Sequence, residues 1–169
     1  MAQPTSGKPV VQTVPAARAY ASVFTLVALL GFAFTIAFAP DRLAVVITSV
    51  PIAAFWSGGM ILIMPRVSKS IVPPPRRIDP DQLPPAVGIW GANVTGMVLM
   101  SIMGTAFVVF SLATHEYLPI GILLGGPIVM WAEFRRAKRT EYEQHGVLWM
   151  TTGFAWTSKS RTRYLVAKA

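Results

Sequence analysis

The sequence predicts an all-α, polytopic membrane protein, with four transmembrane helices arranged as two tight hairpins and both termini in the cytoplasm. Three observations support this fold class. The 169-residue chain is 53% hydrophobic and only 13% charged, whereas charged residues make up about 25% of a typical soluble domain. Four long runs carry no charged side chain. Nearly all of the lysines and arginines lie outside the two short connections that join these runs in pairs.

The first hairpin is predicted over residues 20–64. Its two uncharged runs, 20–39 and 43–64, are each long enough to cross a bilayer core, which takes about 20 apolar residues. Only the turn sequence "PDR" separates them. The first run is longer than the ~7–15 residue core of a secretory signal, so we expect it to be retained. Residues 1–19 are predicted to be a flexible cytoplasmic N-terminus.

The second hairpin is predicted over residues 86–132. Residues 86–113 are uncharged, "THEY" follows, and the next apolar run, 118–132, is the shortest of the four. It can span if Trp131 lies at the interface. Residues 133–145 are charged and rich in helix formers, so they are predicted to continue this helix as far as Gly146.

Residues 65–85 form a proline-rich cytoplasmic linker that contains "SIVPPPRRIDPDQLPP". Proline favours a stiff, extended backbone of about 3.1 Å per residue, so we interpret this segment as a strap between the hairpins. The alternative is a polyproline ligand for a partner's groove. The sequence leaves open whether this strap lies on its own helix bundle or on a neighbouring protein.

The distribution of positive charge sets the predicted orientation. Only Arg42 falls in a hairpin connection; the other lysines and arginines precede the first span, lie between the second and third, or follow the fourth. The positive-inside rule therefore places both termini and the linker in the cytoplasm. We expect the protein to lie in the inner (plasma) membrane of the cell. The net charge of +8 is then mostly a topology signal and an attraction to lipid headgroups, not a nucleic-acid signal.

The basic tail, residues 133–169, ends in a segment with two interpretations. "VLWMTTGFAW" is apolar and aromatic but too short to span, and "RTRYLV" alternates like a strand. We favour an interfacial segment with its aromatic rings among the headgroups. The alternative is a β-hairpin that turns near Ser158 and docks on another subunit. The residues predicted to contact headgroups or a partner are Arg76, Arg77, Arg135, Arg136, Trp149, Trp156, Arg161 and Arg163.

The sequence offers no candidate chemistry. There is no cysteine, and no ionisable residue falls inside the four cores, where such residues usually mark a functional site. The two histidines, His115 and His145, lie outside the spans. We therefore predict no catalytic residue, no cofactor and no metal. The strongest polar groups within a span are Asn93 and Thr95, expected to hydrogen-bond between helices.

Small residues four apart predict close helix packing, because they let helix backbones approach each other. The pairs are Ala54 and Gly58, Ala92 and Gly96, and Gly121 and Gly125. The hairpins also share a faint pattern: "PIAAFWSGGMILIM" resembles "PIGILLGGPIVM" with one gap. A parallel duplication would place a pseudo-twofold axis along the membrane normal.

These observations predict a non-enzymatic accessory or assembly subunit of a larger inner-membrane complex, such as respiratory, secretion or cell-envelope machinery. Its expected partners are the lipid bilayer and other membrane subunits, not nucleic acid. The alternative is a small homo-oligomeric channel or facilitator whose pore is lined by polar residues of the third span: Asn93, Thr95, Ser101 and Thr105. No motif indicates a known family.

Overall fold

The structure is a computed structural model that describes residues 9–71, 74–151 and 163–167, without the side chains of residues 64–71 and 90–93. It is mostly helical, with four long helices: α1 (Thr13–Phe38), α2 (Arg42–Ile71), α3 (Ile89–Thr114) and α4 (Leu118–Glu143). All four are long and apolar enough to cross a membrane. The predicted four spans are therefore confirmed at this level.

The helix ends extend beyond the apolar runs. α1 begins at Thr13, inside the segment predicted to be a flexible N-terminus; Pro15 lies in its first turn, where no intrahelical N–H bond is lost. α2 continues into the predicted linker. α3 ends at His115, whose φ of 57° is left-handed and stops the helix. α4 continues unbroken past its apolar run as predicted, ending at Glu143.

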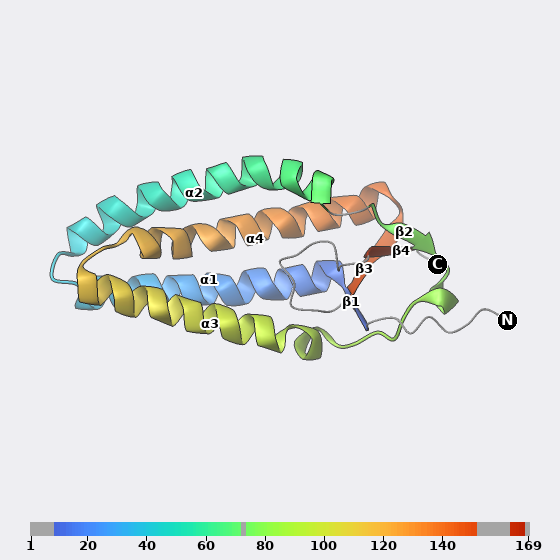
Figure 1. The fold of residues 1–169 in the computed structure, drawn as a ribbon, viewed down its shortest axis with the longest axis horizontal. Coiled ribbons are helices and arrows are strands. Elements are labelled where there is room, and N and C mark those ends of the chain that lie inside the picture. The colour runs from blue at the N-terminus through green and yellow to red at the C-terminus, as the bar shows by residue number, and fades with distance from the viewer. Residues whose placement is uncertain (1–8, 72–73, 152–162, 168–169) are drawn as a thin grey trace.

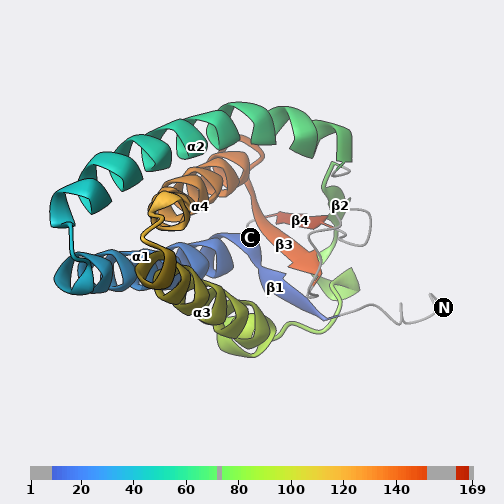
Figure 2. The ribbon, with the colours of Figure 1, turned by 60° about the vertical axis from the view of Figure 1, so that its left-hand side comes forward.

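The helices do not pack as two self-contained hairpins. Short loops join α1 to α2 and α3 to α4 at one end of the bundle, but α1 makes few contacts with α2. α4 lies between α1 and α2 and has its most extensive contacts with these two, while α3 packs mainly on α1 (Figures 1 and 2). A pseudo-twofold axis would make the α2–α3 contact match the α1–α4 contact. The former is marginal at most among the described residues, so the packing lacks the symmetry that a duplication predicts.

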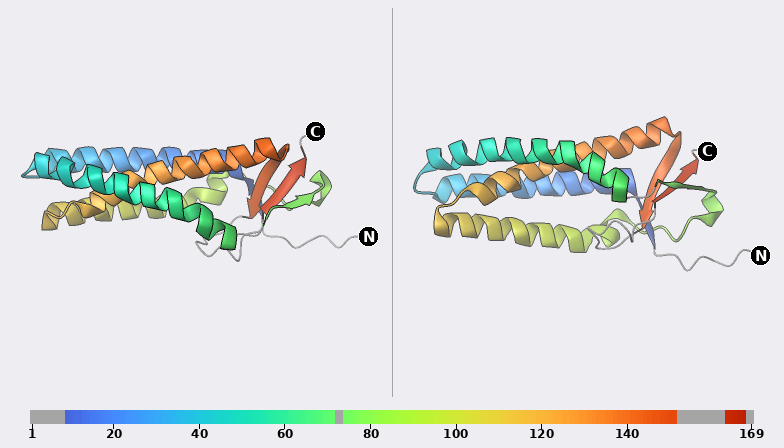
Figure 3. Two further views of the ribbon diagram at one scale, coloured as in Figure 1. Left: turned by 90° about the horizontal axis from the view of Figure 1, so that it is seen from above. Right: turned by 45° about the horizontal axis from the view of Figure 1, so that its top comes forward.

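A four-stranded sheet closes the opposite end of the molecule (Figures 1 and 3). Its strands are β1 (Val10–Gln12), β2 (Arg76–Ile78), β3 (Gly146–Thr151) and β4 (Arg163–Ala167), in the spatial order β1-β3-β4-β2. The β1–β3 and β3–β4 pairs are antiparallel and the β2–β4 pair is parallel. The all-α prediction was therefore too narrow. The strands are only three to six residues long, and most of them pair with strands far away in the sequence, so no local pattern reveals the sheet.

The described tail residues after α4 form the strands β3 and β4, as the β-hairpin alternative predicted. Trp149 of β3 lies opposite Tyr164 of β4 and also opposite Gln12 of β1. The β3–β4 pair therefore packs on β1 of the same chain. Ser158, Trp156 and Arg161 lie outside the described residues.

The proline-rich strap also lies on its own chain. It pairs with β4 through β2, passes through the short 3₁₀ turn η1 (Pro80–Gln82), and reaches the far edge of the sheet. There Val10 N donates to Pro85 O (3.0 Å) and Val87 N donates to Val10 O (2.9 Å). The strap therefore supplies β2 at one edge of the sheet, and its residues 85–87 hydrogen-bond to Val10 of β1 at the other edge.

The sheet joins three parts of the chain that the helices separate. β1 precedes α1, β2 lies between α2 and α3, and β3 and β4 follow α4. Hydrogen bonds hold these strands together, so all three parts lie at the same end of the bundle, here called the sheet end. The α1–α2 and α3–α4 connections lie at the loop end (Figure 1).

Candidate functional site

The described parts of the four spans contain hydroxyls but no buried ionisable group. Thr95, Ser101 and Thr105 are all exposed on α3. Ser101 Oγ donates to Met97 O (3.0 Å) and Thr105 Oγ1 to Ser101 O (2.9 Å), so these hydroxyls are satisfied within their own helix. Their exposure places them on the outer surface of α3. The side chain of Asn93 lies outside the described residues.

Glycines of α4 allow the close approach of its neighbours. A Cβ added at Gly121 would lie 2.6 Å from Ile52 Cγ2 and 2.9 Å from the carbonyl oxygen of Ser49. One added at Gly125 would lie 3.0 Å from the carbonyl oxygen of Ala53. The predicted pair Gly121 and Gly125 therefore packs against the backbone of α2.

The other two predicted pairs have different surroundings. Gly96 of α3 lies against the ring of Tyr20 from α1, whereas the side chain of its partner Ala92 lies outside the described residues. Ala54 is exposed, and a Cβ added at Gly58 would meet nothing within 4 Å. The Ala54–Gly58 pair therefore contributes no packing within the described part of the chain.

An apolar groove lies beside this pair, between α2 and the start of α4. Its volume is about 390 Å³, and it is lined by Pro51, Ile52, Phe55, Trp56, Leu118 and Ile122. The Phe55 side chain is 87% exposed. In a membrane, this surface meets lipid tails or an apolar helix, and it offers no polar group for a soluble ligand.

Arg136 links α4 to α2 at the sheet end. Its guanidinium forms an ion pair with Glu133 one turn earlier and donates to the carbonyl oxygen of Ile61 (2.8 Å). That carbonyl would normally accept from the residue four positions on, which is Pro65, and proline has no N–H. Arg136 thus satisfies an acceptor that α2 cannot satisfy itself. It was predicted to contact headgroups or a partner subunit; within its own chain it contacts Glu133 and Ile61.

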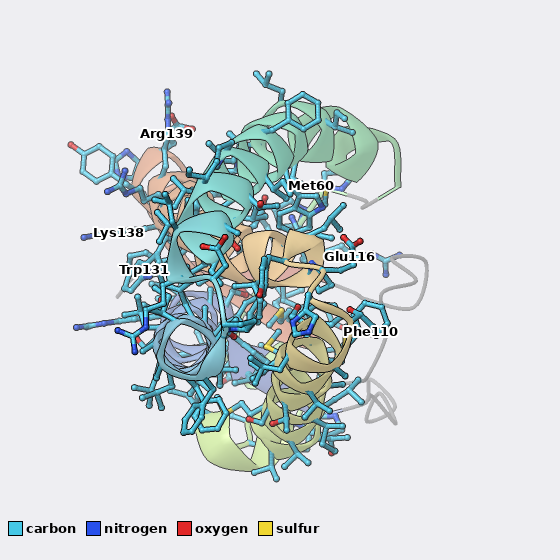
Figure 4. The ribbon with its side chains drawn as sticks, turned by 90° about the vertical axis from the view of Figure 1, so that its left-hand side faces the viewer. Met60, Phe110, Glu116, Trp131, Lys138 and Arg139 are labelled. Carbon is cyan, nitrogen blue, oxygen red and sulfur yellow. The ribbon has the colours of Figure 1, made fainter. Side chains whose placement is uncertain are left out.

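A basic surface runs along the outside of α4 beyond Trp131 (Figure 4). Arg135, Lys138 and Arg139 are exposed, and Arg139 Nε donates to Glu143 (2.6 Å), as the four-residue spacing of this pair allows. The indole Nε1 of Trp131 donates to Thr25 Oγ1 of α1 (3.1 Å). This bond fixes the relative height of the two helices.

A shallow polar hollow lies at the sheet end, beside β2 and β4. It has a volume of about 490 Å³ and is lined by Arg77, Ile78, Asp79, Gln82, Gln144, His145, Leu165 and Ala167. Its polar side chains are exposed and include both signs of charge. No three acidic or histidine residues of the described chain converge on a metal-sized space there or elsewhere.

The other predicted contact residues that the structure describes lie at the sheet end. Arg76 and Arg77 are exposed on β2, while Trp149 on β3 and Arg163 on β4 are half-buried. Sequence reasoning did not single out Arg18 and Lys138, which are both exposed. The sequence does show that Arg18 lies seven residues before Thr25 and that Lys138 lies seven residues after Trp131. This spacing places each pair on one helix face.

Comparison of the chain with protein-family models, with curated proteins and with solved structures gave no match.

Proposed function

We propose that this protein is a non-enzymatic accessory or assembly subunit of a larger inner-membrane complex, with both termini in the cytoplasm. The observation that carries this proposal is the unused small-residue pair of α2. Gly121, Gly125 and Gly96 contact neighbouring helices of the same chain, but Ala54 and Gly58 face outward with open space above the glycine. In lipid, such pairs serve close helix association, so this face fits a helix of a partner subunit.

The exposed surface around Gly58 supports the same proposal. Val50 and Leu62 continue the stripe at intervals of four residues, with side chains 50% and 68% exposed. Large side chains at the ends and small ones between them make a shallow depression along the helix. A partner helix with a complementary ridge would fill it, whereas lipid chains would fill it less tightly.

Replacing Gly58 with leucine is expected to reduce recovery of the partner roughly tenfold, which corresponds to ~1.4 kcal/mol of association energy. The added side chain would block the approach of the partner's backbone. The isolated chain should remain folded, because nothing lies within 4 Å of the added Cβ. The measurement is purification of the tagged full chain from native membranes in mild detergent, followed by quantitative mass spectrometry.

The matched control is Ala33→Leu, which enlarges an exposed small residue on α1. It should leave partner recovery unchanged. Purification of the wild-type chain alone, without a stoichiometric partner, would overturn the subunit proposal. The alternative, a homo-oligomeric channel, instead requires solute flux in liposomes that contain only this protein; its proposed lining hydroxyls already donate to their own helix.

The cytoplasmic orientation is tested by thiol labelling, because the chain has no cysteine of its own. Glu116→Cys lies at the loop end and Gln82→Cys at the sheet end, and both positions are exposed. In intact cells, a membrane-impermeant maleimide should label Glu116→Cys and should label Gln82→Cys only after lysis. The reverse pattern would place the sheet outside.

A further inference from the structure

We propose that Arg18, Arg135 and Lys138 bind the phosphate of an anionic phospholipid on the α1–α4 face of the bundle. These three residues are here called the seam cations. The proposal is independent of the subunit function and requires only that the helices span a membrane.

The hydrogen bond between Trp131 and Thr25 places Arg18 and Lys138 at one height, with Arg135 one helical turn before Lys138. α1 and α4 run antiparallel, and each helix rises about 1.5 Å per residue. Arg18 precedes Thr25 by seven residues and Lys138 follows Trp131 by seven, so both lie about 10 Å beyond the hydrogen bond, toward the sheet end. Seven residues are nearly two full turns, so each cation keeps the face of the residue that makes the bond. Arg18 and Lys138 therefore flank the same seam between the helices.

This height is the edge of the apolar zone. Arg18 is the last charged residue before the uncharged part of α1. On α4, Arg135 lies four residues beyond Trp131, and Trp side chains collect at the boundary between hydrocarbon and headgroups. The headgroup layer is only about 5–8 Å thick on each side of the hydrocarbon core. Long basic side chains can extend within it to reach phosphate oxygens.

The neighbouring anions of α4 are already engaged. Glu133 pairs with Arg136, Glu143 with Arg139, and Glu141 accepts from the backbone N–H of Leu148 (2.9 Å). The seam cations are exposed and form no ion pair with any described residue. Three positive charges within one helical turn in height repel each other, so an anion between them is favoured. Trp131 and Lys138 extend from α4 to the same side of the bundle (Figure 4), leaving this face open to lipid.

The test uses the full chain, purified in detergent and stripped of lipid, with native mass spectrometry to follow binding of added phosphatidylglycerol. Each cation near a membrane surface contributes about a fivefold effect, so Arg18→Gln with Lys138→Gln should weaken binding roughly 25-fold. Lys138→Arg should retain binding because it keeps the charge. The matched control is Arg139→Gln, which removes a neighbouring cation already paired with Glu143 and should change binding less than twofold.

Circular dichroism tests whether the double variant folds, which is expected because both side chains are exposed. If the double variant is unfolded, Lys138→Gln alone should still weaken binding about fivefold. Equal binding of phosphatidylcholine, or an equal loss in the Arg139→Gln control, would overturn the proposal. So would equally tight binding of soluble glycerol phosphate, which would indicate a free phosphate ester as ligand. Unchanged lipid binding in the double variant with loss of a co-purifying protein would show that the seam cations serve a partner's acidic residues.

Discussion

Replacing Gly121 with alanine is expected to destabilise the bundle by about 1–3 kcal/mol, the usual cost of overpacking, even though alanine is the better helix former. Helix propensity alone would favour the substitution by about 1 kcal/mol. Packing opposes it, because the new Cβ would lie 2.9 Å from a backbone oxygen, that of Ser49, and 2.6 Å from Ile52 Cγ2. A backbone carbonyl cannot rotate away like the end of a flexible side chain, so α2 and α4 must separate.

The measurement is reversible unfolding of the purified full chain in detergent. The same substitution at Gly59 is the control, because its added Cβ would meet nothing within 4 Å. Gly59→Ala should leave stability unchanged or raise it by less than about 1 kcal/mol. If Gly121→Ala also stabilises the protein, the close α2–α4 contact is wrong.

Replacing Arg136 with methionine should cost about 1–3 kcal/mol through the acceptor that it abandons. The carbonyl oxygen of Ile61 would lose its donor, and Glu133 would lose its cation near a membrane where water is scarce. Methionine has a similar length and can preserve the packing of the stem. Thermal unfolding of the two proteins in the same detergent measures the difference.

A second substitution separates the lost hydrogen bond from the lost ion pair. In a Pro65→Ala background, residue 65 gains the N–H that Ile61 O normally accepts from within the helix. Arg136→Met should therefore cost less there than in the wild-type chain. An equal cost in both backgrounds would show that Arg136 stabilises the protein through Glu133 alone.

The spans could be predicted because lipid imposes a simple requirement of length and apolarity, and residues 20–39 and 43–64 meet it without a single charge. Which face of each helix points inward could not be predicted in this way. A span is apolar on all sides, so Gly121 and Gly58 appear alike in sequence, yet one contacts a neighbouring backbone and the other contacts nothing. The order of packing, with α4 between α1 and α2, depends on that choice.

The sheet was largely missed for a different reason. β1 is three residues long and finds its partner, β3, more than 130 residues later, so no local pattern identifies it. β4 was recognisable from its alternation. β2 lies among prolines, which favour an extended chain but do not indicate which strand it pairs with. Apart from Arg42, the basic side chains that the structure describes lie toward the sheet end. The difference between Arg136, which has partners in its own chain, and the seam cations depends on the positions of Glu133 and Ile61.

The strand order has a consequence for biosynthesis. The two outer strands, β1 and β2, are made before the ribosome reaches α3, whereas the two central strands, β3 and β4, are made last. β1 and β2 do not pair with each other in the sheet, so their strand partners are made only after α4. The sheet is therefore completed only after all four helices have been made, and a chain that ends before Gly146 lacks both central strands.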